Sequence, residues 1–280
     1  MGQKNQGLRQ NSKLFSNKFF IFSIFFFTIK LLIVYRISNY NVGLVNGKVW
    51  LGADGENYLK GVNALVKDGA YSKESILNYW PAGYPLTLYF LSFFGKSLTL
   101  TVLSVFQSAV FSISIYLFIL EIQKTKIKSF AFFIFLLLSL NPTLTFASLC
   151  IGYESLAASG FLLITSCLLY DIRIKTKKSL LMSLFYVSIT FSYIAFIQPR
   201  FLVTAILILT IWAIVRGGFK SFAAITFVGL LIVSILPTGL IFRNHMATGQ
   251  NTISTNLGVT MNIGAGDTTG GYVKNPRSEE

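Results

Sequence analysis

Seven long apolar runs, separated by short polar segments, dominate this sequence of 280 residues. Each run approaches the roughly 17–25 mostly apolar residues that a helix needs to cross a bilayer. Because lipid offers no hydrogen-bond partners, a spanning segment must pair its own backbone groups, which a helix does. We therefore predict an all-α, polytopic integral membrane protein. The expected spans are 19–36, 98–120, 129–149, 155–170, 179–198, 201–216 and 220–241.

Composition supports this class. Hydrophobic residues make up 53% of the chain and charged residues only 12%, against about 25% charged in soluble domains. The first run follows a basic segment, as in a signal peptide, but Lys30 interrupts it and no small-x-small cleavage site follows. We therefore expect an uncleaved anchor. Cys150 and Cys167 lie in or beside apolar runs without metal or redox spacing, which favours small buried side chains.

Basic residues are concentrated in alternate loops, and this bias sets the orientation. One set of loops has 13 basic residues and two acidic ones, Glu121 and Asp171. The basic residues are Lys4, Arg9, Lys13, Lys18, Lys124, Lys126, Lys128, Arg173, Lys175, Lys177, Lys178, Arg216 and Lys220. We place this set in the cytoplasm and expect the plasma (inner) membrane. The net charge of +14 then reflects topology, and we expect no nucleic-acid partner.

This orientation divides the chain into three parts. Residues 1–18 form a cytoplasmic basic N-terminus, and residues 19–241 form a transmembrane module with an outer loop at 37–97. Residues 242–280 lie outside and are expected to begin a further part of the protein. The apolar stretch at 80–95 is short and contains two prolines, so we interpret it as an interfacial or re-entrant helix. Its aromatic residues Trp80, Tyr84 and Tyr89 would then lie at the headgroup level.

Asp54 opens the clearest motif of the outer loop. Leu59, Val62, Leu65 and Val66 recur after it at helical spacing, before a Gly at position 69 that is typical of a helix C-cap. This pattern predicts an amphipathic helix on the membrane surface. Asp54 either caps that helix or holds a carboxylate at the membrane face to take a proton from an acceptor hydroxyl.

Three further polar positions face the same side. Glu154 lies in a short outer turn. It is either an acid stabilised at a helix N-terminus or a functional acid at the membrane boundary. Arg200 follows Pro199 and is either a membrane anchor or a phosphate ligand. Residues 236–272 are rich in Gly, Thr and Asn and include Arg243. Such a loop either approaches a ligand or is simply a long outer loop.

Together these stretches resemble the GT-C superfamily of membrane glycosyltransferases. The branch is that of the dolichyl-phosphate-mannose–protein mannosyltransferases and the bacterial lipid A aminoarabinose transferases. The first stretch, at 53–72, reads ADGENYLKGVNALVKDGAYS, and the second, at 80–95, reads WPAGYPLTLYFLSFFG. The third, at 140–156, reads LNPTLTFASLCIGYESL, and the last comprises PTGLIFRN at 237–244 and ISTNLGVTMNIGAGDTTGGY at 253–272.

The resemblance implies an enzyme that moves a sugar from a polyprenyl-phosphate donor to a hydroxyl acceptor outside the cytoplasm. The acceptor would be an envelope glycan, a lipid or a protein. The catalytic residues implied are Asp54 and Glu154, and the substrate-binding residues are Glu56, Tyr58, Arg200, Arg243 and Asn244. No metal ligand is predicted, and no cofactor is certain. A divalent cation, Mg²⁺ or Mn²⁺, is compatible with this chemistry.

Two departures from the family pattern keep other readings open. Gly55 separates Asp54 from Glu56, where relatives often have adjacent acids, and Gly264-Ala265-Gly266 stands where they often have Gly-Asn-Asn. One alternative is a transporter or lipid flippase, which should place charged or broken-helix sites near the membrane midplane. The other is an inactive partial transferase that acts as a membrane scaffold.

The basic bias predicts which positions face which side. Positions 54, 154, 200 and 243 should share the non-cytoplasmic face, and 124–128 and 173–178 should face the cytoplasm. With Cys150 and Cys167 replaced, an impermeant thiol reagent added to intact cells should label Glu154→Cys but not Lys126→Cys. Labelling of Lys126→Cys from outside would contradict the topology.

Overall fold

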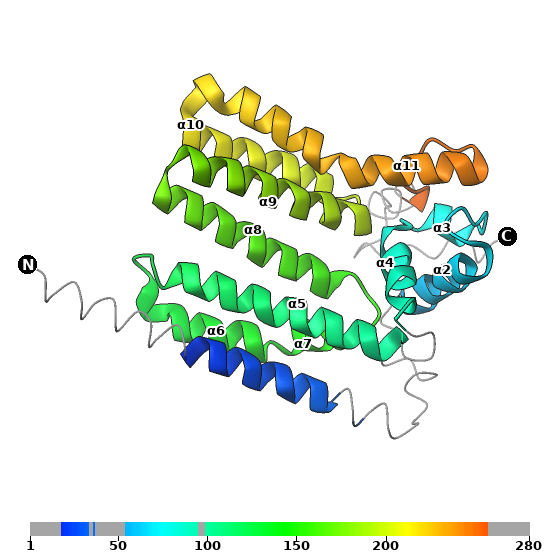
Figure 1. The fold of residues 1–280 in the computed structure, drawn as a ribbon, viewed down its shortest axis with the longest axis horizontal. Coiled ribbons are helices and arrows are strands. Elements are labelled where there is room, and N and C mark those ends of the chain that lie inside the picture. Colours follow the sequence, from blue (N-terminus) through cyan, green and yellow to red (C-terminus); the bar gives the residue numbers. More distant parts are fainter. Residues whose placement is uncertain (1–17, 34–35, 37–53, 95–98, 257–280) are drawn as a thin grey trace, which may run out of the picture.

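The protein is described here by a computed structural model that covers residues 18–33, 36, 54–94 and 99–256 (Figure 1). The Gly264-Ala265-Gly266 and Thr-Gly-Gly-Tyr motifs lie outside the described residues, as do most of the predicted cytoplasmic N-terminus and the start of the outer loop.

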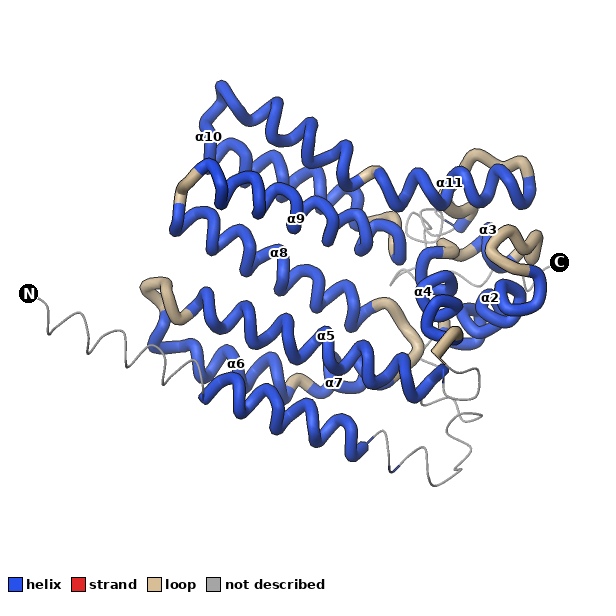
Figure 2. The backbone as a smooth tube through the Cα atoms, viewed as in Figure 1, coloured by secondary structure: helices blue, strands red, loops and turns tan. Residues whose placement is uncertain are grey.

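The described residues are all helical apart from turns and loops, and they contain no strand (Figure 2). A first helix covers 18–33. The others are α2 (Gly55–Asp68), α3 (Ile76–Tyr79), α4 (Gly83–Ser92), α5 (Thr99–Ile122), η2 (Lys128–Phe130), α6 (Ala131–Leu140), α7 (Pro142–Leu149), α8 (Glu154–Ile174), α9 (Lys177–Ile197), α10 (Phe201–Val233) and α11 (Ile235–Thr248).

Five helical segments in the described part of the chain are long and apolar enough to cross a membrane. They are Val102–Ile122, Glu154–Ile174, Lys177–Ile197, Phe201–Gly218 and Phe222–Thr248. A sixth crossing exists if the bent pair Lys128–Leu140 and Pro142–Leu149 counts as one span. These segments coincide with six of the predicted spans. The count of seven stays a prediction, since the first helix is described only over 18–33.

Local chemistry explains where the helices break. Pro142 has no N–H to continue the helix, and the side chain of Asn141 accepts the Leu144 N–H at 2.9 Å, which caps the new helix and leaves a 48° bend. Gly218 divides α10 because its φ of 63° lies in the region that side-chain-bearing residues rarely adopt. The chain therefore reverses there, between the sixth and seventh predicted spans (Figure 1).

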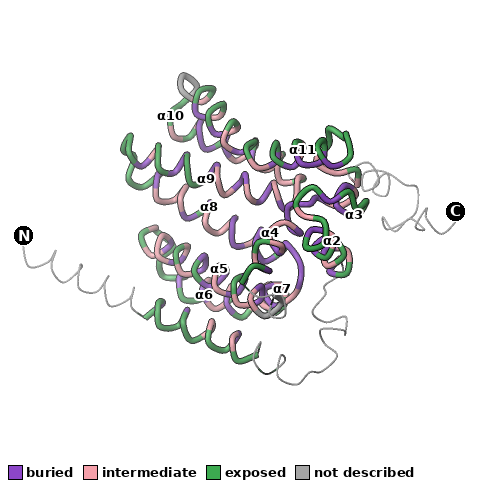
Figure 3. Tube along the Cα trace, turned by 45° about the vertical axis from the view of Figure 1, so that its right-hand side comes forward, coloured by how far each residue is buried: buried purple, intermediate pink, exposed green. Residues whose placement is uncertain are grey.

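Many residues on the outside of the bundle are exposed (Figure 3), and they include large apolar side chains. Examples on α6, α9 and α10 are Phe132, Phe185, Val203 and Phe227, which are between 51% and 64% exposed. An aqueous protein would rarely expose so much apolar surface, whereas a bilayer is its natural solvent. Several apolar helices with this surface indicate a multi-pass membrane protein.

The loops fall at two opposite ends of the bundle, in the grouping that the basic bias predicted. The loops after α5 and α8 and the reversal in α10 lie at one end (Figure 1). Helices α2, α3 and α4 and the C-terminal half of α11 lie at the other (Figure 1). We name these the basic end and the polar-site end. Which end faces the cytoplasm stays a prediction from the sequence.

A buried carboxylate fastens three helices at the basic end. Asp171 on α8 is fully buried and lies 2.9 Å from Arg216 Nε on α10. Ser179 Oγ on α9 donates to Asp171 Oδ1 at 2.6 Å, and Trp212 Nε1 donates to Asp171 Oδ2 at 3.3 Å. Arg216 Nη2 also donates to the Thr176 carbonyl at 2.8 Å. Sequence reading treated Asp171 and Arg216 only as loop charges.

At the polar-site end, α2 packs against α4 rather than standing alone. Its buried face consists of Tyr58, Gly61, Val62 and Leu65. The predicted apolar stripe is therefore only partly correct, because Leu59 is half-buried and Val66 is 37% exposed. The stripe shifts toward Tyr58 because Gly61 lets Leu77 and Pro85 approach closely. Gly69 ends the helix as predicted, with a φ of 82° and its N–H bonded to the Leu65 carbonyl.

The Asp171–Arg216 pair should be a main source of stability. Asp171→Asn leaves the largely buried Arg216 without its counter-charge, which should cost about 3–5 kcal/mol of unfolding free energy. Lys124→Gln removes an exposed pair with Glu121 and should cost less than about 1 kcal/mol. Thermal unfolding in detergent measures both, and equal losses would contradict the special role of Asp171.

Candidate functional site

Asp54 stands at the first turn of α2, but its carboxylate does not cap the helix. Its carbonyl oxygen accepts the N–H groups of Asn57 and Tyr58 at 3.0 and 3.1 Å, whereas the side chain makes no capping hydrogen bond. Asp54 therefore occupies the N-cap position of α2 without making a side-chain cap hydrogen bond. Partial burial raises the pKa of the Asp54 carboxyl above its ordinary value. The carboxylate remains available for another partner.

Tyr58 lies one helical turn after Asp54 and is almost completely buried. Its ring packs edge-on against Tyr84 with a centroid distance of 4.8 Å, and Trp80 lies beside it at 6.3 Å. The Tyr58 ring on α2 is thus held against Tyr84 on α4 and against Trp80, which precedes α4.

Four charged or polar side chains act on the Tyr58 hydroxyl. Burial raises its pKa most, and the nearby Asp54, Tyr153 and Glu154 raise it further, while the Arg200 guanidinium opposes them. Such effects require close approach, since charges act weakly across long distances. Asp54, Glu154 and Arg200, all predicted for the site, therefore lie within electrostatic range of Tyr58 although they are far apart in sequence.

Glu154 begins α8 and is exposed. Its carboxylate folds back over Gly152, so that a Cβ at that position would overlap Glu154 Oε2. Gly152 therefore makes room for this side-chain position.

Arg200 is also exposed and is anchored by Tyr153. Its Nη2 donates to Tyr153 Oη, and the guanidinium carbon lies 5.5 Å from the Tyr153 ring centroid. Phe201 flanks it at 5.4 Å. An aromatic ring and a hydroxyl thus orient the guanidinium while the group remains reachable from outside.

A buried network beneath the site holds the turn at 150–153. Tyr84 Oη accepts the Gly152 N–H at 2.9 Å and donates to Gln107 Oε1 at 3.1 Å. Gln107 Nε2 then donates to the Cys150 carbonyl at 2.9 Å. Tyr84 and Gln107 are fully buried, so the Tyr84 side chain packs inside the protein, while its level relative to the lipid headgroups stays a prediction. Sequence reading missed this network, because its partners are 23 to 68 residues apart.

Arg243 and Asn244 belong to a second cluster. Arg243 donates to the Ala70 carbonyl at 3.0 Å, to Asn78 Oδ1 at 3.2 Å and to the Ser72 carbonyl. It also donates to Asn244 Oδ1 at 2.9 Å. Both side chains are buried, so the guanidinium ties α11 to the loop between α2 and α3.

The amide of Asn244 extends this second cluster toward the chain that follows α11. Its Nδ2 donates to the Thr252 and Ile253 carbonyls at 2.8 and 3.1 Å. The remaining predicted residue, Glu56, is exposed on α2. The phosphate and substrate roles expected of these residues stay predictions, beside the structural contacts now seen for Arg243 and Asn244.

The described residues contain no group of three or more His, Cys, Asp or Glu side chains placed to hold a metal ion. Mg²⁺ is often bound by only one or two carboxylates together with substrate phosphates. Asp54 and Glu154 would suit a divalent cation only in that way, with a phosphate supplying further oxygens.

Comparisons with protein-family models, with characterised proteins and with solved structures give no match to this chain. The resemblance described above therefore rests on its sequence motifs.

The Tyr84 hydroxyl should stabilise the protein through its two hydrogen bonds. Tyr84→Phe keeps the ring against Tyr58 but leaves the buried Gly152 N–H without its partner, at a cost of about 1–3 kcal/mol. Tyr89→Phe on the same helix is the matched control, since its hydroxyl has no hydrogen bond to a described residue. Thermal unfolding should show a loss of stability for Tyr84→Phe but not for Tyr89→Phe. A Tyr84→Phe variant as stable as the parent would contradict a stabilising role for the network.

Proposed function

We propose that this protein is a GT-C-type glycosyltransferase that moves a sugar from a polyprenyl-phosphate donor to a hydroxyl group. The acceptor is an envelope glycan, lipid or protein at the non-cytoplasmic face. One observation carries the proposal: an Asp54 carboxylate that makes no cap hydrogen bond, Glu154 and Arg200 all act electrostatically on one phenol, Tyr58, at one end of an apolar helical bundle. A lipid-borne phosphate and a water-soluble acceptor can meet there.

Asp54 is the general base in this proposal. The acceptor oxygen forms a bond to the anomeric carbon as the bond from that carbon to the phosphate oxygen breaks. The proton of the acceptor hydroxyl passes to the Asp54 carboxylate, and the electron pair leaves with the lipid phosphate. A base works best when its pKa lies near the working pH, and partial burial shifts the pKa of Asp54 upward in that direction.

Arg200 would bind the phosphate. A guanidinium offers a planar set of donors that matches phosphate oxygens, and it would stabilise the charge that grows on the leaving phosphate. Its exposure and its anchoring by Tyr153 support this role. The contacts of Arg243 favour a structural role instead, since its N–H groups already donate to backbone carbonyls and to Asn78 Oδ1.

Glu154 completes the site. Its exposed carboxylate could position the acceptor or the sugar through hydrogen bonds to hydroxyl groups, since an ionised carboxylate accepts several. Tyr58 would line the wall of the site, and Glu56 would contact substrate from the outer face of α2.

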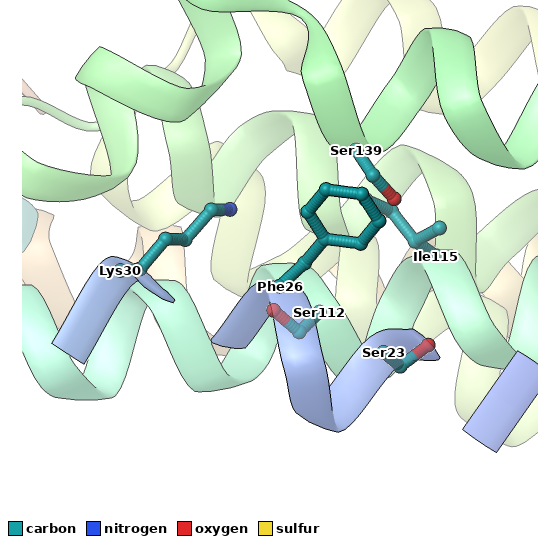
Figure 4. A pocket seen from close by; sticks show the side chains of 6 residues that line it. All are labelled: Ser23, Phe26, Lys30, Ser112, Ile115 and Ser139. Atoms are coloured by element: carbon teal, nitrogen blue, oxygen red, sulfur yellow. The ribbon is translucent and has the colours of Figure 1, made fainter. Parts of the chain in front are cut away.

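The transporter reading rests on buried charge within a span, for which Lys30 is the candidate. Its side chain is 3% exposed, and its ammonium lies 4.5 Å from the Phe111 ring centroid. The adjoining cavity, lined by Ser23, Phe26, Lys30, Ser112, Ile115 and Ser139, measures about 10 Å³ (Figure 4). Such a space holds about one water molecule, so it favours a structural lysine over a transport path.

Asp54→Asn tests the proposal, because Asn caps a helix about as well as Asp but cannot accept a proton at neutral pH. The variant should insert normally and lose transfer by roughly 10²–10⁴-fold. Glu56→Gln, two residues away on the exposed face of α2, should lose much less. The measurement is transfer of labelled sugar from a panel of polyprenyl-phosphate sugars by equal amounts of membrane-inserted protein.

Two outcomes would count against the proposal. Transfer by Asp54→Asn equal to that of the parent would remove Asp54 as the base. No transfer by the parent from any donor in the panel would favour the scaffold reading.

A further inference from the structure

An apolar groove lies between the first helix and α6. It measures about 450 Å³ and is lined by Lys18, Phe19, Ile21, Phe22 and Phe132. Ligand pockets commonly measure about 300–1,000 Å³, so the groove is large enough for a ligand chain. Ile21 is 63% exposed and Phe132 is 51% exposed, so these walls are open to the surroundings of the bundle.

Stacked aromatic rings give this groove a fixed shape. Phe132 on α6 lies 6.5 Å from Phe19 and 6.2 Å from Phe22 between ring centroids. The ring of Phe135, which is almost fully buried, packs edge-on against Phe19 with a centroid distance of 5.4 Å. The floor is therefore packed and the walls are apolar, which suits a hydrocarbon chain.

Cations gather at one mouth of the groove. Lys18 lines it directly. Lys128 begins the short helix η2 that leads into α6, one turn before Phe132, and Lys126 precedes it; both are exposed. Glu121, the acid nearest to Lys126 and Lys128 in sequence, pairs instead with Lys124 at 2.6 Å and with Arg173 at 2.9 Å.

We propose that this groove binds one anionic phospholipid, with an acyl chain along the aromatic walls and the phosphate at Lys18 and Lys128. Basic pockets between membrane helices bind anionic lipid headgroups in this way. A zwitterionic lipid carries its own cation beside the phosphate and gains less. The chain's own N-terminus is a poor occupant, since residues 1–17 carry Lys4, Arg9 and Lys13 and no acid.

Native mass spectrometry of the full chain, released from micelles containing phosphatidylglycerol or phosphatidylcholine with the same acyl chains, tests this site. The parent should retain phosphatidylglycerol in preference to phosphatidylcholine. Each lysine near an anionic headgroup contributes about fivefold in affinity, so Lys18→Gln with Lys128→Gln should weaken retention by roughly 30-fold. Lys177→Gln with Lys178→Gln removes the same charge from another loop at the basic end and should have little effect.

A second pair of variants tests the acyl-chain subsite without changing charge. Ile21→Trp fills the groove and should reduce retention of phosphatidylglycerol, whereas Ile24→Trp changes an exposed residue outside the groove lining and should not. Equal retention of both lipids by the parent would overturn the proposal. So would equal losses in the two lysine pairs, or in the two tryptophan variants, since either result indicates attraction to the surface in general.

Discussion

The requirement that every backbone N–H and C=O group find a partner without water shapes this protein. A helix meets it within one segment, and at two breaks in the bundle a side chain helps to meet it again. At Asn141 the side-chain oxygen takes the N–H of Leu144 that the interrupted helix leaves unpaired. At Thr176 the side chain accepts the Ser179 N–H, and the Ser179 hydroxyl accepts the Thr176 N–H in return. At these two breaks the sequence therefore supplies a side-chain cap.

Several serine hydroxyls inside the bundle are paired within their own helices. The hydroxyls of Ser114, Ser159 and Ser166 each donate to the carbonyl four residues earlier, at 2.6 to 2.7 Å. They are therefore satisfied within their own helix and behave toward neighbours as small side chains, which lets helices approach. Gly160 extends this close contact, because a Cβ there would meet Ile194 at about 2.5 Å.

The two ends of the bundle use buried polarity differently. At the basic end, Asp171 is surrounded by donors from α9 and α10, so its charge serves only to hold helices together. At the polar-site end, the buried network of Tyr84 and Gln107 supports a turn whose neighbours, Glu154 and Arg200, remain exposed. A buried ion pair holds one end together, and the other end presents exposed charged groups on a packed base, as the proposed catalytic role would require.

The sequence by itself determined the helical class, the places of the five helical segments that are long and apolar enough to cross a membrane, and the division of the described loops between two ends. These follow from run length, proline, glycine and charge, which act locally and can be read along the chain. It also singled out Asp54, Glu154, Tyr58 and Arg200, which the fold brings together around one phenol. Only the tertiary structure decided that Tyr84 lies inside, that the Asp54 side chain does not cap α2, and that Arg243 holds a loop. Each of these depends on which distant backbone group approaches a side chain, and that is fixed by helix packing, which no local pattern encodes.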